Sequence, residues 1–274
     1  MKTLIVLAIL FLPALAGAQT PKPVGLFDAG HNPPWWASFA TLSDVDPPHV
    51  WAEAKALSVS RGTLWWLKLG YHEDPRTPIG AHAARVRARL DEYGLLPYVR
   101  GMSIGEEWYG YWTAGDLTRF GLPPGYPNGH RIIRDWLGYQ HAEAKRHIPV
   151  PVIWITPVVT GWDGPLPIPL NTDGVALDPY VFPGGTFQSD VEPYLWMAEQ
   201  VTSLPLVLIA QWFEAPGFES PREADVAKYL AWVNRPRWIA LAAFTWRDRP
   251  ALSMTGLEHL PGLRAAVESA VRSR

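Results

Sequence analysis

Two adjacent carboxylates, Glu106 and Glu107, end a short apolar run and are followed at once by aromatic residues, among them Trp108, Tyr109 and Trp112. Apolar surroundings disfavour the charged form of a carboxyl group, which suits an acid that must donate a proton near neutral pH. The stretch therefore indicates a catalytic acid set in a surface on which sugar rings can stack. The alternative is a pair of solvated loop carboxylates beside exposed aromatic rings.

Strand alternation distinguishes the two glutamates. Met102 and Ile104 share a strand face with Glu106, whereas Ser103 shares the opposite face with Glu107. The larger apolar pair is the better candidate for packing beneath helices, which turns Glu107 toward the interior of the sheet. We therefore expect Glu107 to be the acid and Glu106 a neighbouring ligand or supporting residue.

Short apolar runs alternate with helical patterns along the chain. Strands are predicted over 23–30, 38–45, 62–70, 98–107, 151–157, 173–180, 205–213 and 238–246. Helices are predicted over 77–94, 130–147, 190–203, 220–235 and about 257–272, the fourth opening with the capping box Ser220-Pro221-Arg222-Glu223. Continuous apolar strands alternating with helices indicate parallel βαβ units, and eight of them in one domain favour a closed (β/α)8 (TIM) barrel of class α/β.

Polar and aromatic residues gather at the carboxyl ends of these strands, where a barrel places its chemistry. The candidate substrate-binding residues are Asp28, His31, Trp35, Trp36, Lys68, Glu106, Trp108, Tyr109, Trp112, Tyr180, Gln211, Trp212 and Trp246. The opposite strand ends are mostly apolar or carry Pro23, Pro151 and Pro205. Four further tryptophans, Trp65, Trp136, Trp196 and Trp232, lie inside strand or helix patterns and are expected in the core.

A cleft with carboxylates and aromatic faces suits a carbohydrate. Glycosidic hydrolysis needs one carboxylic acid for the leaving oxygen and a second carboxylate as nucleophile or base. With Glu107 as the acid, the second carboxylate is Glu214 or Asp178, although Asp178 before Pro179 also fits a turn. No spacing of histidines or carboxylates predicts a metal site, and we expect no cofactor.

Four segments resemble the (β/α)8 glycoside hydrolase superfamily in order and placement: SIGEEW, VALDPYVF, PLVLIAQWFE and AAFTWRD. That resemblance implies a general acid after strand four and a nucleophile after strand seven. This chain departs from the family pattern twice. Glu106 stands where the family usually has Asn before the acid, and Gln211 stands near the usual place of the nucleophile, three residues before Glu214.

Composition and the N-terminus set the remaining expectations. The chain has 274 residues, a net charge of −2 and no cysteine, so neither a nucleic-acid partner nor disulfides are expected. Residues 1–18 have the pattern of a signal peptide and 19–274 would form the mature domain. The sequence therefore predicts a secreted or periplasmic, monomeric glycoside hydrolase without a membrane anchor. The alternative is a catalytically inactive carbohydrate-binding barrel.

Overall fold

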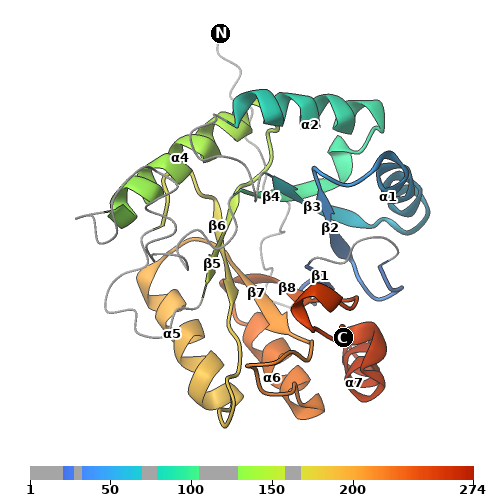
Figure 1. The fold of residues 1–274 in the computed structure, drawn as a ribbon, viewed down its shortest axis with the longest axis vertical. Coiled ribbons are helices and arrows are strands. Elements are labelled where there is room, and N and C mark those ends of the chain that lie inside the picture. Colours follow the sequence, from blue (N-terminus) through green and yellow to red (C-terminus); the bar gives the residue numbers. More distant parts are fainter. Residues whose placement is uncertain (1–20, 28–32, 70–78, 105–128, 158–167) are drawn as a thin grey trace.

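The computed structural model describes residues 21–27, 33–69, 79–104, 129–157 and 168–274, and within them eight parallel strands form one sheet (Figure 1). The strands are β1 (Val24–Leu26), β2 (Phe39–Ser43), β3 (Leu64–Leu69), β4 (Val99–Ile104), β5 (Ile153–Pro157), β6 (Gly174–Asp178), β7 (Leu206–Gln211) and β8 (Trp238–Phe244). Their order is β4-β3-β2-β1-β8-β7-β6-β5. All eight lie within the segments that the sequence predicted as strands.

The sheet curls so that its two outer strands approach each other. Met102 of β4 forms a parallel bridge with Val152, which immediately precedes β5. The Met102 backbone N–H donates to the Pro151 carbonyl at 2.9 Å. The predicted (β/α)8 barrel is therefore confirmed as a nearly closed barrel of eight parallel strands.

Helices surround the strands as an outer ring (Figure 1). The helices are α1 (Pro48–Arg61), α2 (Gly80–Glu92), α4 (Gly129–His147), α5 (Glu192–Val201), α6 (Glu223–Val233) and α7 (Pro261–Arg272). Short helical turns cover Leu96–Tyr98, Phe187–Val191, Pro250–Leu252 and Leu257–His259.

Two helical details differ from the sequence prediction. Helix α1 was not predicted, because its buried positions Val50, Trp51, Ala54 and Ser58 are interrupted by small and polar residues and give a weak apolar stripe. The capping box predicted for α6 does not form, since that helix begins at Glu223 after Arg222, with no side-chain cap.

The apolar core has two shells separated by the sheet. One shell fills the barrel interior and includes Phe27, Phe39, Trp66, Ile155 and Ile209. The other packs between the strands and the helices, and it holds most of the buried apolar residues. Alternation along each strand sends successive side chains into one shell and then the other, so a residue's shell tells whether it faces the barrel interior.

The tryptophans predicted as core residues divide between buried and exposed positions. Trp65 and Trp232 are buried in the outer shell, and Trp136 is half-buried against it. The prediction for Trp196 is wrong: its side chain is 44% exposed on α5. The Arg235 guanidinium covers one face of that ring at 4.1 Å from its centroid, so a cation–π contact takes the place of burial.

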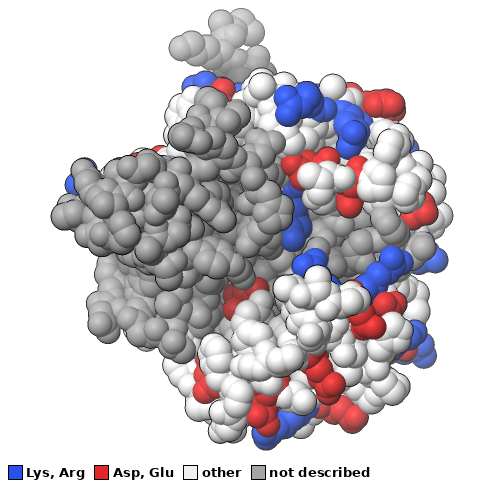
Figure 2. Space-filling model, viewed as in Figure 1, with Lys and Arg blue, Asp and Glu red and all other residues white. Residues whose placement is uncertain are grey.

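The face in Figure 2 carries Lys and Arg interspersed with Asp and Glu wherever the structure describes it. Among the described residues, no helix is both long and apolar enough to cross a membrane.

His141 of α4 makes the stability of the fold pH-dependent. Its side chain is fully buried and its Nδ1 lies 3.0 Å from the Thr172 hydroxyl. Burial lowers the pKa of His141 from 6.5 to about 3. Between these values the unfolded chain binds a proton that the folded chain does not, so stability falls as the pH drops through this window. The expected slope is up to about 1.4 kcal/mol per pH unit.

Urea unfolding of the wild type and of His141→Gln at pH 7, 6, 5 and 4 measures this contribution. Glutamine can still bond to Thr172 but does not titrate, so the variant should lose less stability than the wild type between pH 6 and pH 4. Parallel stability curves for the two proteins would contradict the assignment.

Candidate functional site

Polar side chains enter the mouth of the barrel from several strand ends. Thr41 of β2, Lys68 of β3, Asp178 of β6 and Gln211 of β7 each stand two residues after a side chain of the interior shell. Alternation therefore points all four toward the barrel axis at the carboxyl end of the sheet. Three of them, Lys68, Asp178 and Gln211, are residues that the sequence predicted for the site.

Asp178 is the best-placed carboxylate among the described residues. It is the last residue of β6 and only 4% exposed. The hydroxyl of Tyr180, itself a predicted site residue, donates a hydrogen bond to the Asp178 carboxylate. A carboxylate at a barrel mouth with a donor from its own loop is held in a fixed orientation, as a reacting group must be.

Aromatic rings form a floor that crosses the mouth toward Asp178. Ring centroids lie 6.0 Å apart for Phe27 and Phe244, 5.4 Å for Phe244 and Phe213, and 5.5 Å for Phe213 and Tyr180. At the other end, the Lys68 ammonium lies 4.5 Å from the centroid of Phe27. The floor therefore connects Lys68 on one side of the barrel with Tyr180 on the other.

The three phenylalanines of this floor were not among the predicted site residues. Phe213 follows Gln211 by two positions and Phe244 follows Ala242 by two, so the alternation of β7 and β8 could have assigned both to the mouth.

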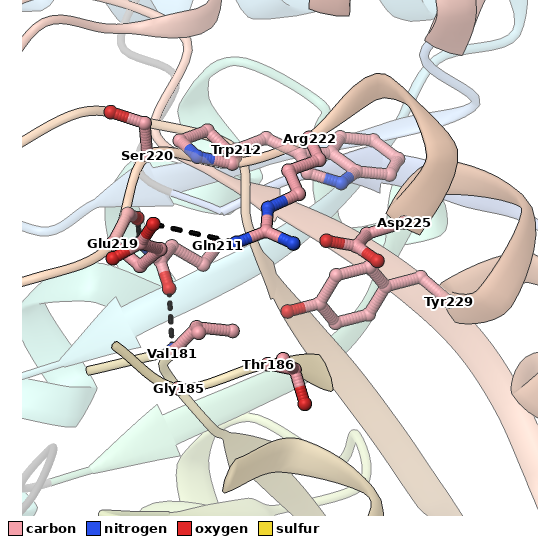
Figure 3. Close-up of a pocket in the computed structure, with 11 residues that line it drawn as sticks. Val181, Gly185, Thr186, Gln211, Trp212, Glu219, Ser220, Arg222, Asp225 and Tyr229 are labelled. Carbon is pink, nitrogen blue, oxygen red and sulfur yellow. Dashed lines mark hydrogen bonds and ion pairs between the residues drawn. The ribbon is translucent and has the colours of Figure 1, made fainter. Parts of the chain in front are cut away.

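Gln211, the last residue of β7, holds two loops together (Figure 3). Its side chain is 2% exposed. Its Oε1 accepts from the Val181 backbone N–H at 2.7 Å, and its Nε2 donates to the Glu219 carbonyl at 2.8 Å. The amide thus joins the loop after β6, which carries Tyr180, to the loop after β7. Next to it is a cavity of only about 10 Å³, room for about one water molecule.

The two bonds of Gln211 require one acceptor and one donor, which predicts the effect of a carboxylate at this position. Gln211→Glu should destabilise the fold by about 1–3 kcal/mol, because an ionised carboxylate cannot donate to the Glu219 carbonyl. Chemical denaturation near pH 7 measures the loss. A variant as stable as the wild type and more active would instead mark position 211 as a nucleophile site.

Glu214, the other candidate for the second carboxylate, lies differently from Asp178. Its side chain is exposed and, within the described part of the chain, forms no hydrogen bond or ion pair. Its backbone pairs with Thr255 of the loop after β8, with N···O distances of 3.0 and 2.8 Å. It also follows Trp212 by two positions, and Trp212 belongs to the outer shell. Of the two carboxylates, Asp178 is the one directed into the mouth.

Three of the tryptophans predicted to bind substrate are buried beneath the helices. Trp212 is 1% exposed and packs edge-on against Tyr229 of α6. Trp36 and Trp246 pack against each other at 6.1 Å, and the Arg264 guanidinium lies 5.3 Å from the Trp246 ring. Protein atoms cover these rings in place of the predicted ligand. Alternation along β7 explains the direction of Trp212 but not those of Trp36, which precedes β2, and Trp246, which lies beyond the end of β8.

Trp35 lies on the outside of the molecule. It is 52% exposed, and the Arg272 guanidinium of α7 lies 4.5 Å from its ring centroid. This contact ties the segment before β2 to the C-terminal helix.

The other predicted site residues lie outside the described part of the chain: Asp28, His31, Glu106, Glu107, Trp108, Tyr109 and Trp112. The strand that leads to the two glutamates is described. Met102 and Ile104 are buried in the outer shell, as the sequence predicted, and Ser103 is buried on the opposite face. The inward and outward alternation of side chains, on which the preference for Glu107 rests, is therefore observed as far as Ile104.

A groove of about 550 Å³ opens beside the loop after β6. The rings of Phe182 and Tyr194 line it, together with Ser189 and the Asp190 carboxylate. Partial burial and the Asp190 charge raise the pKa of the Tyr194 hydroxyl, so it stays protonated and able to donate. Aromatic faces with hydroxyl and carboxylate groups match the C–H faces and hydroxyls of a sugar.

Phe218 links this groove to the mouth. Its ring centroid lies 5.0 Å from that of Tyr180 and 5.9 Å from that of Phe182. The aromatic surface therefore continues from Asp178 outward to the groove. Among the described residues, no cluster of three or more histidine, aspartate or glutamate side chains has the geometry of a metal site.

Comparison with solved structures gives barrels of the same architecture. A GH113 β-1,4-mannanase aligns with a TM-score of 0.55 and 10% identity over 93% of this chain and 100% of its own. The GH113 β-mannanase of Alicyclobacillus acidocaldarius aligns with a TM-score of 0.51 and 13% identity, over 92% of this chain and 97% of its own. The fold is therefore a (β/α)8 barrel, the architecture that these two mannanases also have.

β-Glucuronidase 2 of Bacteroides uniformis, in a calcium-binding mutant form, aligns with a TM-score of 0.53 and 13% identity. The alignment covers 82% of this chain, which spans about 30% of the glucuronidase chain. No protein-family model matches the sequence, and no curated protein matches it either. At these identities the likeness concerns the fold alone.

Proposed function

We propose that the protein is a glycoside hydrolase that cleaves O-glycosidic bonds of an oligo- or polysaccharide, with Glu107 as general acid and Asp178 as the second carboxylate. The observation that carries the proposal is Asp178 itself, a buried carboxylate at the mouth of a glycosidase-type barrel, oriented by Tyr180 and flanked by an aromatic floor. Glu107 follows the strand-four run of the same barrel.

The reaction divides between the two carboxyl groups. Glu107 gives its proton to the glycosidic oxygen as the bond to the anomeric carbon breaks, so the leaving sugar departs as a neutral alcohol. Asp178 either attacks the anomeric carbon or takes a proton from an attacking water. A separation of roughly 5–5.5 Å between the carboxyl groups leads to retention, and roughly 6.5–9.5 Å to inversion.

The surface from Tyr180 through Phe218 to the groove at Phe182 supports a substrate longer than a disaccharide. Rings along such a path can stack on successive sugar units. Because two of the similar structures are β-mannanases, β-1,4-mannan is the first polymer to test, followed by other plant and microbial polysaccharides.

Release of reducing ends from these polymers, measured beside equilibrium binding, tests the proposal. Wild type should release products, and the Glu214→Gln variant should do so at a similar rate because that side chain is exposed. A wild-type protein that binds polymers and releases no product would overturn the hydrolase assignment.

A non-catalytic carbohydrate-binding barrel is the second candidate. It is favoured by Gln211, because the usual nucleophile position carries an amide engaged in two structural hydrogen bonds. This candidate predicts that polymer binding survives both Asp178→Asn and Glu107→Gln and that no variant, wild type included, forms product.

The N-terminal segment supports export of the protein. Residues 1–18 have a positive start, an apolar run and a small-residue cleavage pattern, so the mature chain would begin at Gln19. The N-terminal sequence of the protein recovered from a secreting host measures this, and an unprocessed Met1 would contradict it.

A further inference from the structure

A second cavity, of about 440 Å³, lies at the amino-terminal end of the barrel. Residues from the amino-terminal ends of all eight strands line it, from Pro23 before β1 to Ile239 and Ala240 of β8. It is therefore coaxial with the barrel and opens on the face opposite to Asp178. Its size falls within the range of pockets that bind small molecules.

The lining of this cavity is almost entirely apolar. Its walls include the rings of Phe39 and Trp66 and the side chains of Val207 and Ala240. Pro23, Pro151 and Pro205 form part of its rim, and these are the prolines that the carbohydrate chemistry at the other end leaves unexplained. Proline has no N–H, so a rim rich in it presents little that water can bind.

Charge at the mouth of the cavity is positive. Lys145 donates to both oxygens of Asp173, at 2.8 and 2.7 Å, and the two charges offset each other. Arg100 is exposed, and its Nη1 donates to the carbonyls of Pro97 and Val99 at 2.7 and 3.3 Å. Within the described ranges Arg100 has no carboxylate partner, so one guanidinium charge remains unmatched beside the apolar walls.

We propose that this cavity binds a single-chain amphiphile with an anionic head, of the long-chain carboxylate class. The apolar body would fill the space between Phe39, Trp66 and Val207, and the carboxylate would lie at Arg100, whose planar guanidinium suits bidentate pairing with it. The interior side chains separate this site from the mouth that holds Asp178, so the proposal stands independently of the hydrolase assignment.

Dodecanoate, decanoate and octanoate are the probes, titrated below their micellar concentrations by calorimetry against the chain beginning at Gln19. Affinity should rise about fourfold for each added methylene, since each buried methylene contributes about 0.8 kcal/mol. Dodecyltrimethylammonium, with the same tail and a cationic head, should bind at least tenfold more weakly. Equal affinity for the two heads, or no dependence on chain length, would overturn the proposal.

Two variants locate the site. Ala240→Phe places a ring in the cavity and should abolish dodecanoate binding, whereas Arg100→Glu, on the surface, should weaken it at least tenfold and leave the melting temperature nearly unchanged. If Ala240→Phe fails to fold, Arg100→Glu and the comparison of dodecanoate with dodecyltrimethylammonium still test whether the cavity binds an anionic amphiphile.

The full chain, with residues 1–18 retained, serves as the matched comparison. Binding that appears only after their removal would mean that residues 1–18 occupy the cavity in the unprocessed chain, and the proposal would then stand for the processed chain. Size-exclusion chromatography with and without dodecanoate tests the remaining occupant: a dimer that dissociates as the probe binds would assign the cavity to a second copy.

Discussion

Asp178→Asn is expected to lower kcat by about 10²- to 10⁴-fold, the range that a positioned carboxylate contributes to such a reaction. Asparagine matches aspartate in shape and can still accept the bond from the Tyr180 hydroxyl, so the loop after β6 should keep its place. What is lost is the negative charge that attacks the anomeric carbon or activates water. Initial rates of reducing-end release, with the melting temperature measured alongside, give the effect.

Glu214→Gln is the matched control, since it makes the same chemical change at the other candidate carboxylate. Its exposure and its backbone pairing with Thr255 predict a rate within about threefold of the wild type, since a surface substitution away from the reacting groups disturbs little. If Glu214→Gln loses activity and Asp178→Asn keeps it, the nucleophile or base follows strand seven, as in the family pattern, and Asp178 is a turn residue.

Glu107→Gln is expected to have an effect that depends on the leaving group. On a polysaccharide, whose leaving sugar needs a proton, the rate should fall by about 10²- to 10⁴-fold. On an aryl glycoside with an acidic phenol as leaving group, the loss should be small, because that phenol departs without protonation. Comparing the two substrates separates loss of the acid from loss of the fold.

Glu106→Gln provides the neighbouring control. As a ligand or supporting residue, Glu106 should affect both substrates to a similar extent, without dependence on the leaving group. The opposite pattern, a leaving-group effect at position 106 and a uniform one at 107, would exchange the roles of the two glutamates and contradict the strand alternation of β4.

The barrel could be predicted from the sequence because its strands are continuous apolar runs. Ile153 to Thr156 and Leu206 to Ala210 are buried on both faces, and strands of a parallel sheet covered on both sides give such runs. Helix α1 could not be predicted from the sequence, because it carries no strong apolar stripe. Its buried face consists of Trp51 and small residues such as Ala54. Its stability comes from tertiary packing.

Asp178, Tyr180 and Gln211 could be predicted for the barrel mouth because strand ends are readable from the apolar runs. The tryptophans could not be assigned in the same way. Trp36, Trp212 and Trp246 all belong to the outer shell. Only Trp212 continues the alternation of its strand, because Trp36 precedes β2 and Trp246 lies in the loop after β8, where the strand pattern no longer sets the direction of a side chain.

The role of the Gln211 amide also could not be predicted from the sequence. The sequence shows a glutamine at this strand end, but only the contacts with Val181 and Glu219 explain what its amide does there. Both partners are backbone atoms of loops, and the sequence does not show which loop residues lie beside Gln211. This role of the amide can therefore be recognised only in the structure.

The measurement that tests the central assignment most directly is the separation of the two carboxyl groups in a crystal structure of the Glu107→Gln variant with a bound oligosaccharide. The two-carboxylate assignment predicts that the position-107 amide and the Asp178 carboxylate face the same glycosidic bond at roughly 5–9.5 Å from each other. A separation beyond about 10 Å, or a sugar bound away from Asp178, would contradict it.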